Sequence, residues 1–600
     1  MLSTLAIQAL TGLASASSLF LVASGLSVIF GVTRVVNFAH GSLCMLGAYL
    51  GWSVLSRLPH DPASFAAGVV MASLGVALFG AALEATLLRR LYRAPALLQL
   101  LATFAVLLVM QDGVQHIWGP ADLPLPRGVW LRSFVPLLGE RFPFYDLILI
   151  AIGPLVLLAL WMVMARTRFG VLLRAATENR DMLSALGVDE RFLFTAVFAL
   201  GAGLAGLGGA LSLPENSANL GIDLRVVTDA FVVVVVGGMG SIAGAYLAAV
   251  LVGVMQAMGI LLLPKASLVL VFVLMALVLV LRPQGVLGQK QTQENDGERF
   301  HRVRAAPPWQ RIAGLAVVLL ALAVGLAGGD FARSVLEEMA IAVLFAASLH
   351  VLLGPGGMIS FGHAAWFGIG AYAVALTTST LAAPLPLALL AGVLAAGAVA
   401  AIVGLVLVRL SGVSLAMLTL AFAQIAWAVA TQWSEVTGGD DGILGIWPPS
   451  GLGARLFFLL CLCLSVGGVL LLRRALFAPF GYALRASRDA ASRAAASGID
   501  GAKLRLAAFA LAGAAAGLAG GLSTFSKGSV FPGSLAIFRS VDALAMVLLG
   551  GVQSMVGPVV GALAYTGLFD TLLLASDYWR ALLGITLLAL ILWRPQGLVK

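Results

Sequence analysis

Charged residues and cysteines are scarce in this sequence of 600 residues. Only 10% of the residues are charged and 61% are hydrophobic, a balance that excludes a soluble globular protein. The three cysteines (Cys44, Cys461 and Cys463) all lie in apolar segments, so hydrophobic packing is favoured over a metal or redox site. The motifs HExxH and GxSxG are absent and the six histidines are scattered, which argues against an enzyme that works within the membrane.

Apolar stretches long enough to cross a bilayer recur through the chain, without the strand-like alternation of an outer-membrane barrel. The predicted fold class is all-α, a polytopic helical membrane protein with two homologous halves of about nine and ten transmembrane helices. The first half has its spans at 5–30, 41–58, 64–88, 95–115, 144–165, 192–213, 228–237, 244–262 and 265–281. The second half has them at 311–329, 334–353, 361–381, 385–409, 412–433, 454–473, 505–525, 541–550, 557–576 and 580–593. Because the first charged residue is Arg34, the first thirty residues are interpreted as a mature transmembrane helix and not as a signal peptide.

The basic residues, which dominate a formal net charge of +9, gather in short loops between the predicted spans. Such clustering is typical of cytoplasmic loops in membrane proteins and argues against a nucleic-acid-binding surface. It places these loops inside the cell and the N-terminus outside. The residues concerned are Arg89, Arg90 and Arg93, then Arg166, Arg168, Arg174 and Arg180, and then Arg473, Arg474, Arg485, Arg488 and Arg493.

The sequence repeats four signatures in the same order, with an offset of a little over three hundred residues. They are NFAHG at 37–41 and SFGHA at 360–364, Phe169-Gly170 and Phe480-Gly481, GGMGSIAG at 237–244 and GGVQSMVG at 550–557, and RPQG at 282–285 and 594–597. This order predicts two homologous modules around one central pathway, an arrangement that points to transport. The predicted modules are 1–288 and 311–600, the second with one additional N-terminal helix. A polar cytoplasmic linker at 289–310 joins them.

Two polar loops, 166–191 and 473–505, keep the same residue register in both halves. Each contains a stretch with charges on one side and alanine or leucine on the other, followed by a glycine that signals a helix end. One interpretation is an amphipathic helix that lies on the membrane surface. The favoured interpretation is a helix on which a cytoplasmic partner docks, because a surface helix need not keep its register in both halves.

Together these signatures resemble the branched-chain amino acid permeases of bacterial ABC importers. The first half resembles the permease whose signature reads INFAHG. The second half resembles its partner, whose signatures SLGHAAFFGIGAY and LTGGDDGI are matched by residues 360–372 and 436–443. Those permeases are usually separate chains that form a heterodimer, so this sequence is similar to a natural fusion of the two. It departs from the family pattern at Gln553, where the first half has Gly240.

The resemblance implies a translocation subunit of the bacterial inner membrane, driven by two cytoplasmic ATPases and fed by an extracytoplasmic substrate-binding protein. The chain contains no GxxxxGK(S/T), so we expect the partner subunits to use ATP and this chain to bind no cofactor. Branched-chain amino acids are the expected substrates, and urea, short amides and aromatic acids remain open. The residues expected to dock the ATPases are Phe169, Gly170, Arg174 and Gly187 in the first module, and Phe480, Gly481, Arg485 and Gly498 in the second.

The repeated motifs also supply candidates for the translocation path, namely Asn37, Phe38, His40, Ser360, Phe361 and His363. For the two histidines, hydrogen bonding between helices is favoured over contact with substrate. Asp440 and Asp441 lie in a glycine-rich loop on the predicted outer side, where they either contact the binding protein or solvate a turn.

An ion-coupled secondary transporter is the alternative function. Such a protein needs ionisable groups deep in the membrane, and this chain offers few. Glu84 lies within two helical turns of Arg89 and is expected to reach the interface. Asp229 and Asp542 fall near the starts of short segments, where interfacial or capping roles are favoured over a proton relay.

Overall fold

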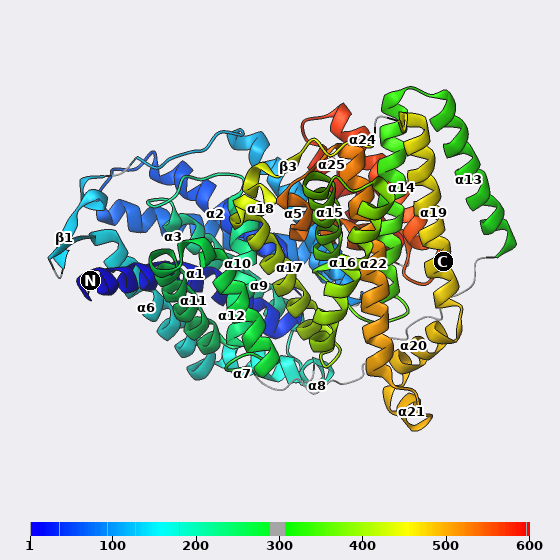
Figure 1. Cartoon of the computed structure of the whole chain (residues 1–600). Helices are drawn as coiled ribbons and strands as arrows, with labels where there is room; N and C mark the ends of the chain where they lie inside the picture. The colour runs from blue at the N-terminus through cyan, green and yellow to red at the C-terminus, as the bar shows by residue number, and fades with distance from the viewer. Residues whose placement is uncertain are drawn as a thin grey trace. The chain divides into compact units, whose positions relative to one another are not determined.

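The structure, a computed structural model, describes residues 2–34, 36–92, 94–126, 128–137, 139–178, 180–288, 307–449, 451–595 and 597–599. Arg93 and most of the predicted linker 289–310 therefore lie outside the described residues. The chain forms two compact units, Met1–Gln293 with Asp577–Leu592 and Glu294–Ser576 with Trp593–Lys600. Each unit is built almost entirely of helices (Figure 1).

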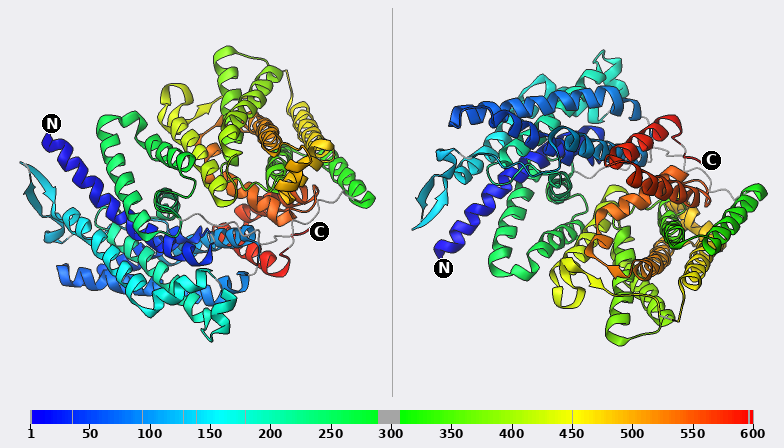
Figure 2. Two further views of the ribbon diagram at one scale, coloured as in Figure 1. Left: turned by 90° about the horizontal axis from the view of Figure 1, so that it is seen from below. Right: turned by 90° about the horizontal axis from the view of Figure 1, so that it is seen from above.

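The first unit contains α1 (Leu2–Thr33), α2 (Ala39–Leu55), α3 (Pro62–Leu83), α4 (Arg89–Leu91), α5 (Ala96–Trp118), α6 (Phe144–Arg166), α7 (Arg168–Glu178), α8 (Arg180–Ala185), α9 (Glu190–Ser212), α10 (Ile222–Gly237), α11 (Ile242–Leu262) and α12 (Ser267–Leu281). Between α5 and α6, β1 (Phe134–Leu137) and β2 (Glu140–Pro143) form an antiparallel hairpin. Figure 2 shows this hairpin projecting beyond the helices of its unit. Nearly all of α25 (Trp579–Trp593) also belongs to this unit.

The second unit contains α13 (Pro308–Ala327), α14 (Asp330–Leu353), α15 (His363–Leu381), α16 (Leu385–Leu407), α17 (Gly412–Gln432), α18 (Ser434–Thr437), α19 (Ala454–Leu476), α20 (Pro479–Asp489), α21 (Ala491–Ala496), α22 (Gly501–Lys527), α23 (Ile537–Gly550) and α24 (Gly557–Ala575). The short strands β3 (Ile443–Leu444) and β4 (Ser529–Val530) pair antiparallel. Proline in the first turn starts α16, α20 and α24, as its fixed φ and missing N–H favour.

Each of the nineteen predicted spans corresponds to a helix, which confirms the predicted all-α membrane class. Among the described residues, fifteen helices are long and apolar enough to cross a membrane. The other four predicted spans are the shorter helices α2, α10, α23 and α25, of 14 to 17 residues. At ~1.5 Å per residue these helices are about 21 to 26 Å long, which is less than the ~30 Å thickness of the hydrocarbon core.

Glycines let paired helices touch backbone to backbone at corresponding positions of the two units. A Cβ at Gly47 of α2 would collide with the backbone of Gly206 in α9, and a Cβ at Gly370 of α15 would collide with that of Gly517 in α22. Helices in a membrane gain no hydrophobic free energy by leaving lipid for each other. Small residues that allow close backbone packing therefore drive their association. The glycine-rich composition is therefore a packing requirement of these helix pairs.

The RPQG signature closes the end of a short helix in each unit. Gly285, in the first RPQG, has φ +82° and lies against Gly238 at the end of α10. The residues that follow donate to that helix end, from Val286 N to Val236 O at 2.8 Å. In the second unit, Leu598 N donates to Leu549 O at 2.9 Å. The terminal carbonyls of α10 and α23, which have no partner within their own helix, are thereby satisfied by a segment distant in sequence.

We expect the substitution Gly47→Ala to destabilise the purified protein by about 1–3 kcal/mol, because the added methyl group forces α2 away from α9. Thermal unfolding in detergent, followed by size-exclusion chromatography, measures the effect. Gly113→Ala in α5 is the matched control, because a Cβ there has no neighbour within 4 Å. Equal melting temperatures for the two variants would contradict the packing argument.

Candidate functional site

The polar loops 166–191 and 473–505 form the same elbow of two short helices, α7–α8 in the first unit and α20–α21 in the second. Figure 1 shows α20 and α21 beyond the ends of α19 and α22. Gly170 and Gly481 are buried at the turn of each elbow. A Cβ at Gly170 would collide with the backbone of Met164, and one at Gly481 with that of Leu476. The Phe-Gly pair is thus needed for the sharp bend from the preceding span.

An arginine in each elbow binds the end of the preceding span. Arg174 Nη1 donates to Met164 O at the end of α6. Arg485 Nη2 donates to Leu476 O of α19 at 2.9 Å, and its guanidinium lies 4.4 Å from the ring centroid of Tyr482. The last carbonyls of a helix lack partners within it and carry partial negative charge, so a guanidinium there supplies both a donor and a favourable charge.

A glycine in the left-handed conformation ends the second short helix of each elbow. Gly187 has φ +81° and Gly498 has φ +79°. After Gly187, Val188 N donates to Leu183 O at 3.4 Å, and the second elbow repeats the pattern with Ile499. These bonds form the Schellman motif of a helix end. Gly187 and Gly498 are therefore required for the backbone turn, and the space around both is open.

An aspartate then starts the next span. Asp189 accepts a hydrogen bond from the backbone of Arg191 in α9, and Asp500 accepts from those of Ala502 and Lys503 in α22. The backbone N–H and then the side chain of Lys503 hold the pKa of the exposed Asp500 carboxyl below its ordinary value. A depressed carboxyl pKa means that this cap stabilises the fold at neutral pH and is lost as the pH falls through that pKa.

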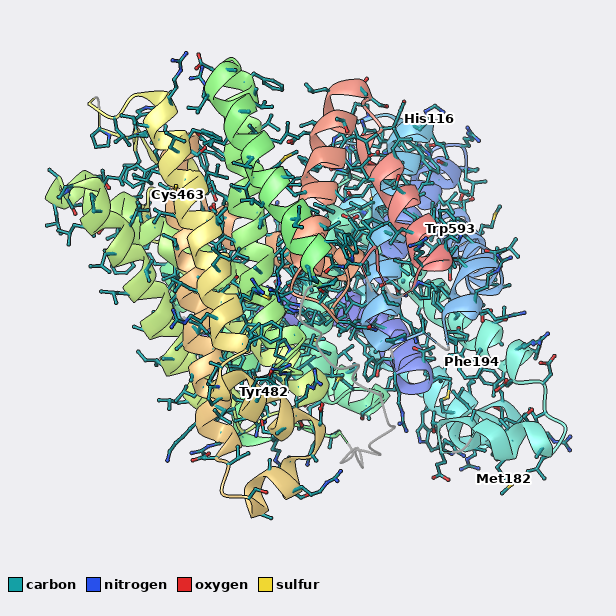
Figure 3. The ribbon with its side chains drawn as sticks, turned by 90° about the vertical axis from the view of Figure 1, so that its right-hand side faces the viewer. His116, Met182, Phe194, Cys463, Tyr482 and Trp593 are labelled. Atoms are coloured by element: carbon teal, nitrogen blue, oxygen red, sulfur yellow. The ribbon has the colours of Figure 1, made fainter. Side chains whose placement is uncertain are left out.

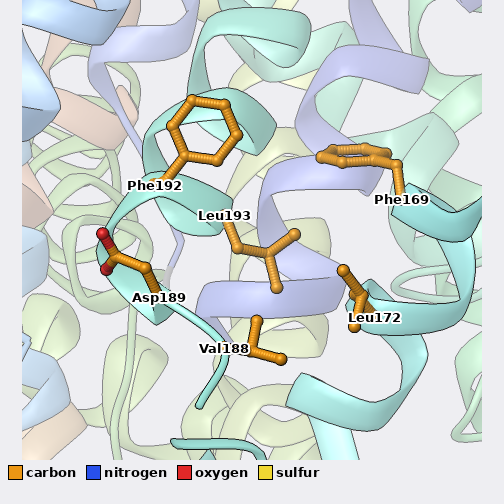
Figure 4. Close-up of a pocket in the computed structure, with 6 residues that line it drawn as sticks. All are labelled: Phe169, Leu172, Val188, Asp189, Phe192 and Leu193. Atoms are coloured by element: carbon orange, nitrogen blue, oxygen red, sulfur yellow. The ribbon is translucent and has the colours of Figure 1, made fainter.

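The first elbow encloses an open apolar hollow of about 510 Å³ between α7 and the start of α9 (Figure 4). The side chains around it are Phe169, Leu172, Val188, Asp189, Phe192 and Leu193. Phe169 and Leu172 also pack against a buried cluster that includes Val28 of α1 and Phe194 of α9. The elbow is thus fixed on the ends of two spans while Phe192 remains 74% exposed.

The sequence analysis did not predict one contact of each elbow, a hydrogen bond between the elbow and the residue that follows α1 in the first unit or α14 in the second. Arg34, directly after α1, donates from Nη2 to Thr177 O of α7 at 3.1 Å. In the second unit the donor is on the elbow, where Arg488 Nη1 donates to Gly354 O after α14. Thr177 and Arg488 occupy corresponding positions of the repeat. In the first unit the elbow residue accepts the bond and in the second it donates it, so no shared motif marks the contact. The one signal in the sequence is that Arg34 is the first charged residue. In the structure Arg34 has φ +55°, which is rare for a residue with a side chain.

The candidate path residues lie at the starts of α2 and α15, and all six are buried. His40 Nε2 lies 2.9 Å from Val22 O of α1, and His363 Nε2 is hydrogen-bonded to Ser348 Oγ of α14 at 2.7 Å. Phe38 N donates to Thr103 Oγ1 of α5 at 3.2 Å, and Phe361 N donates to Thr419 Oγ1 of α17 at 3.1 Å. Asn37 lines a small hollow of about 20 Å³. These contacts join helices within each unit, and a role of the six residues in the path stays a prediction.

Asp440 and Asp441 are exposed in a single turn of 3₁₀ helix, Gly439–Asp441. The glycines at 438, 439 and 442 all have positive φ, which explains why this loop is rich in glycine. The strand pair β3–β4 then fixes the loop beside the end of α22. Both aspartates are accessible to a partner, and their contact with a binding protein stays a prediction.

Two carboxylates within the predicted spans, Glu84 and Asp542, have polar partners. Glu84 is fully buried in a π-helical turn, Glu84–Leu88, and forms an ion pair with Arg89 at 3.1 Å. It also accepts a hydrogen bond from Thr195 Oγ1 of α9. The expectation that Glu84 reaches the interface is therefore wrong, because its side chain is fully buried against Arg89 and Thr195. Asp542 accepts a hydrogen bond from Tyr565 at 2.7 Å. Among the described residues, no group of His, Cys, Asp and Glu could hold a metal ion.

Comparisons with known proteins match the chain twice to one family. The family profile described as "Branched-chain amino acid transport system / permease component" matches residues 8–281 and again residues 331–591. The high-affinity branched-chain amino acid transport system permease protein BraD of Pseudomonas aeruginosa is 28% identical over 301 residues, which cover 48% of this chain and 97% of that protein. The corresponding proteins LivH and LivM of Escherichia coli are each 26% identical, over 42% and 43% of this chain and 84% and 68% of their own lengths. Each relative matches about half of the chain, as expected for two such modules in tandem.

We expect Arg34→Gln to loosen the first elbow, because the charged donor to α7 is lost. A hydrogen bond of this kind contributes about 1 kcal/mol, so the backbone amides of α7 should exchange about fivefold faster. Hydrogen–deuterium exchange of the purified chain, read by mass spectrometry, measures this rate. Arg168→Gln, at an exposed arginine in the first turn of the same helix, is the control. Unchanged exchange in the Arg34 variant would show that the contact does not hold the elbow.

Proposed function

The chain belongs to the permease-component family of branched-chain amino acid transport systems, and on that premise we propose that it forms both membrane halves of one ATP-driven importer. The family profile matches each module separately, and several relatives bear the names of high-affinity branched-chain amino acid permeases. In this proposal the chain is a fusion of two permease subunits of the bacterial inner membrane. It moves branched-chain amino acids and leaves ATP hydrolysis to separate subunits.

The observation that carries the proposal is the pair of matching elbows. A loop that only connects two spans has no reason to keep the same bend, the same arginine cap and the same left-handed glycine in both modules. Two structurally similar partners, each docking on one module, give such a reason. We therefore assign α7–α8 and α20–α21 as the docking elements of two cytoplasmic ATPases.

The exposed surfaces of the elbows suit a protein partner. Met182 is 60% exposed and Leu186 is 74% exposed in the first elbow, and Tyr482 is 59% exposed in the second. Figure 3 shows Met182 and Tyr482 near one end of their respective units. By the charge distribution this end faces the cytoplasm, where exposed apolar and aromatic side chains mark interaction sites.

Within this proposal the predicted coupling residues have two kinds of role. Gly170, Arg174 and Gly187 give the first elbow its shape, as their counterparts do in the second. Phe169 fixes the elbow on α1 and α9, so that a movement of the elbow moves these two spans with it. ATP-driven closure of the ATPases would thereby switch a cavity between outward and inward access. A binding protein that docks near Asp440 and Asp441 would deliver the substrate.

The direct experiment is to purify the chain in mild detergent from its native membrane and identify what co-elutes by mass spectrometry. We expect ATPase subunits, two per chain, with or without a binding protein. No cofactor is expected on the chain itself. A chain that elutes without any ATPase under conditions that keep it folded would contradict the proposal.

A second test asks whether the shape of the elbow is needed for transport and for binding of the ATPase. We expect Gly187→Val to lower uptake and ATPase co-purification about tenfold, because a side chain in the left-handed conformation costs about 1–2 kcal/mol and disrupts the docking turn. Gly412→Val is the matched control, since Gly412 has φ +57° in open space but lies outside both elbows. If both variants transport alike, the elbow is not the docking element.

A further inference from the structure

The second unit contains a polar cavity that the proposed coupling and docking roles do not use. It has a volume of about 80 Å³ and lies between α14, α22 and α23. Its lining includes the hydroxyl groups of Ser334, Ser523 and Ser526 and the charged side chains of Glu338, Lys527 and Arg539. A cavity of this size holds several water molecules, and hence a carboxylate or ammonium group with the atoms next to it.

The charges in the cavity are of both signs, and they differ in their partners. Lys527 Nζ and Glu338 Oε1 form an ion pair at 3.0 Å. Arg539 instead places its guanidinium over the ring of Phe367, 5.1 Å from the centroid. In the described part of the chain, no carboxylate oxygen lies within the 4.0 Å of an ion pair with Arg539. Asp542, one turn further along α23, accepts a hydrogen bond from Tyr565 and interacts with Arg539 at longer range than an ion pair.

Two further carboxylates, those of Glu337 and Asp570, lie near the cavity and have other partners. Glu337 Oε2 accepts a hydrogen bond from Ser526 Oγ at 2.6 Å, on the α22 side of the cavity. Asp570 of α24 is close enough to interact with Glu338 and Lys527. A group that enters the cavity therefore meets the Arg539 guanidinium, which forms no close ion pair, and the carboxylate of Glu338. This pair of charges suits a zwitterion better than a neutral amide.

The cavity lies at the end of the unit where the predicted outer loops gather. Lys527 is the last residue of α22, and its side chain is about half exposed. The strand β4 follows it directly and pairs with β3, next to the exposed Asp440 and Asp441. Arg539 lies in the first turn of α23, a helix too short to span the bilayer, and broken helices of this kind line substrate sites in transporters.

The first module has no such charges at the corresponding positions. In the register set by His40 and His363, Glu338 corresponds to Ser15. In the registers of the later signatures, Lys527 corresponds to Asn216 and Arg539 to Val226. These three charges of the cavity are therefore not repeated at the aligned positions of the first module, unlike the glycines and arginine caps of the elbows.

We propose that this cavity is the site for the head group of a zwitterionic α-amino acid, with Arg539 receiving the carboxylate and Glu338 the ammonium group. The assignment rests on the proposed import function and narrows its substrate class, because urea and simple amides offer no carboxylate to Arg539. The aliphatic side chain of the substrate lies outside the cavity, whose volume accommodates the head group only.

The first test uses the purified full-length chain in lipid nanodiscs, without a binding protein. Phenylglyoxal modifies accessible arginines, and peptide mass spectrometry reports the modification of Arg539 separately. We expect leucine to protect Arg539, whereas leucinamide, which lacks the carboxylate, leaves it reactive. Equal modification with and without leucine would overturn the site, and this result needs no variant to fold.

The second test measures uptake of labelled leucine by the complete transporter in cells that lack other routes. Arg539→Gln should lower uptake about tenfold or more, since a charge-assisted bond to the carboxylate is lost. Arg539→Lys should recover part of it. Arg225→Gln, at an exposed arginine near the corresponding part of α10, is the matched control and should transport normally. Wild-type uptake by Arg539→Gln would overturn the site.

The two proposals fail in different ways. The head-group site is wrong and the import function stands if ATPases co-purify with the chain, leucine does not protect Arg539 from modification, and leucine uptake does not depend on Arg539. If no ATPase co-purifies, the import function fails whatever the labelling shows.

Discussion

Backbone N–H and C=O groups at helix ends have no water to bind inside a bilayer, and this chain has many such ends because several of its helices stop short of a full span. The repeated signatures are the places where these groups find partners. The NFAHG and SFGHA motifs bring Phe38 N and Phe361 N to threonine hydroxyls of a neighbouring helix. The RPQG segments supply donors to the ends of α10 and α23. The elbow arginines do the same for α6 and α19. These contacts satisfy the ends of the short helices and fix each elbow on the span that precedes it.

The class, the module pair and the positions of the apolar helices could be predicted from the sequence, because hydropathy and repetition can be read directly from the chain. Every predicted span is a helix, including the short segments at 228–237 and 541–550, which are the second halves of α10 and α23. The glycines of the elbows were also found, because Gly187 and Gly498 keep their register.

What the sequence could not supply depends on contacts between distant segments. The hydrogen bond from Arg34 to Thr177 corresponds to one in which the elbow residue, Arg488, is the donor. A comparison of the two halves therefore does not find it. Glu84 was expected near the interface, whereas the π-helical turn directs it inward to Arg89 and Thr195. The cavity around Arg539 joins residues from three helices that have no common motif. Helix α25 lies within the second match to the family profile but almost wholly in the first compact unit.

The two modules are alike in their elbows and differ at the mixed-charge cavity. The elbows agree in their glycines, arginine caps and aspartate caps, as the docking of two related ATPases would require. The charges of Glu338, Lys527 and Arg539 have no charged residue at the aligned positions of the first module, as one substrate per cycle would require. Fusion of the two modules in one chain preserves this asymmetry, because each transporter then contains one copy of each module.

The measurement that tests the central claim most directly is uptake by proteoliposomes that contain the chain with its co-purified partners, together with the binding protein. ATP enclosed on the side of the elbows, or its absence, is the first variable, and the proton gradient is the second. We expect uptake that requires ATP and persists when an ionophore dissipates the gradient. Uptake that does not require ATP and stops when the proton gradient is dissipated would contradict the account and identify an ion-coupled transporter instead.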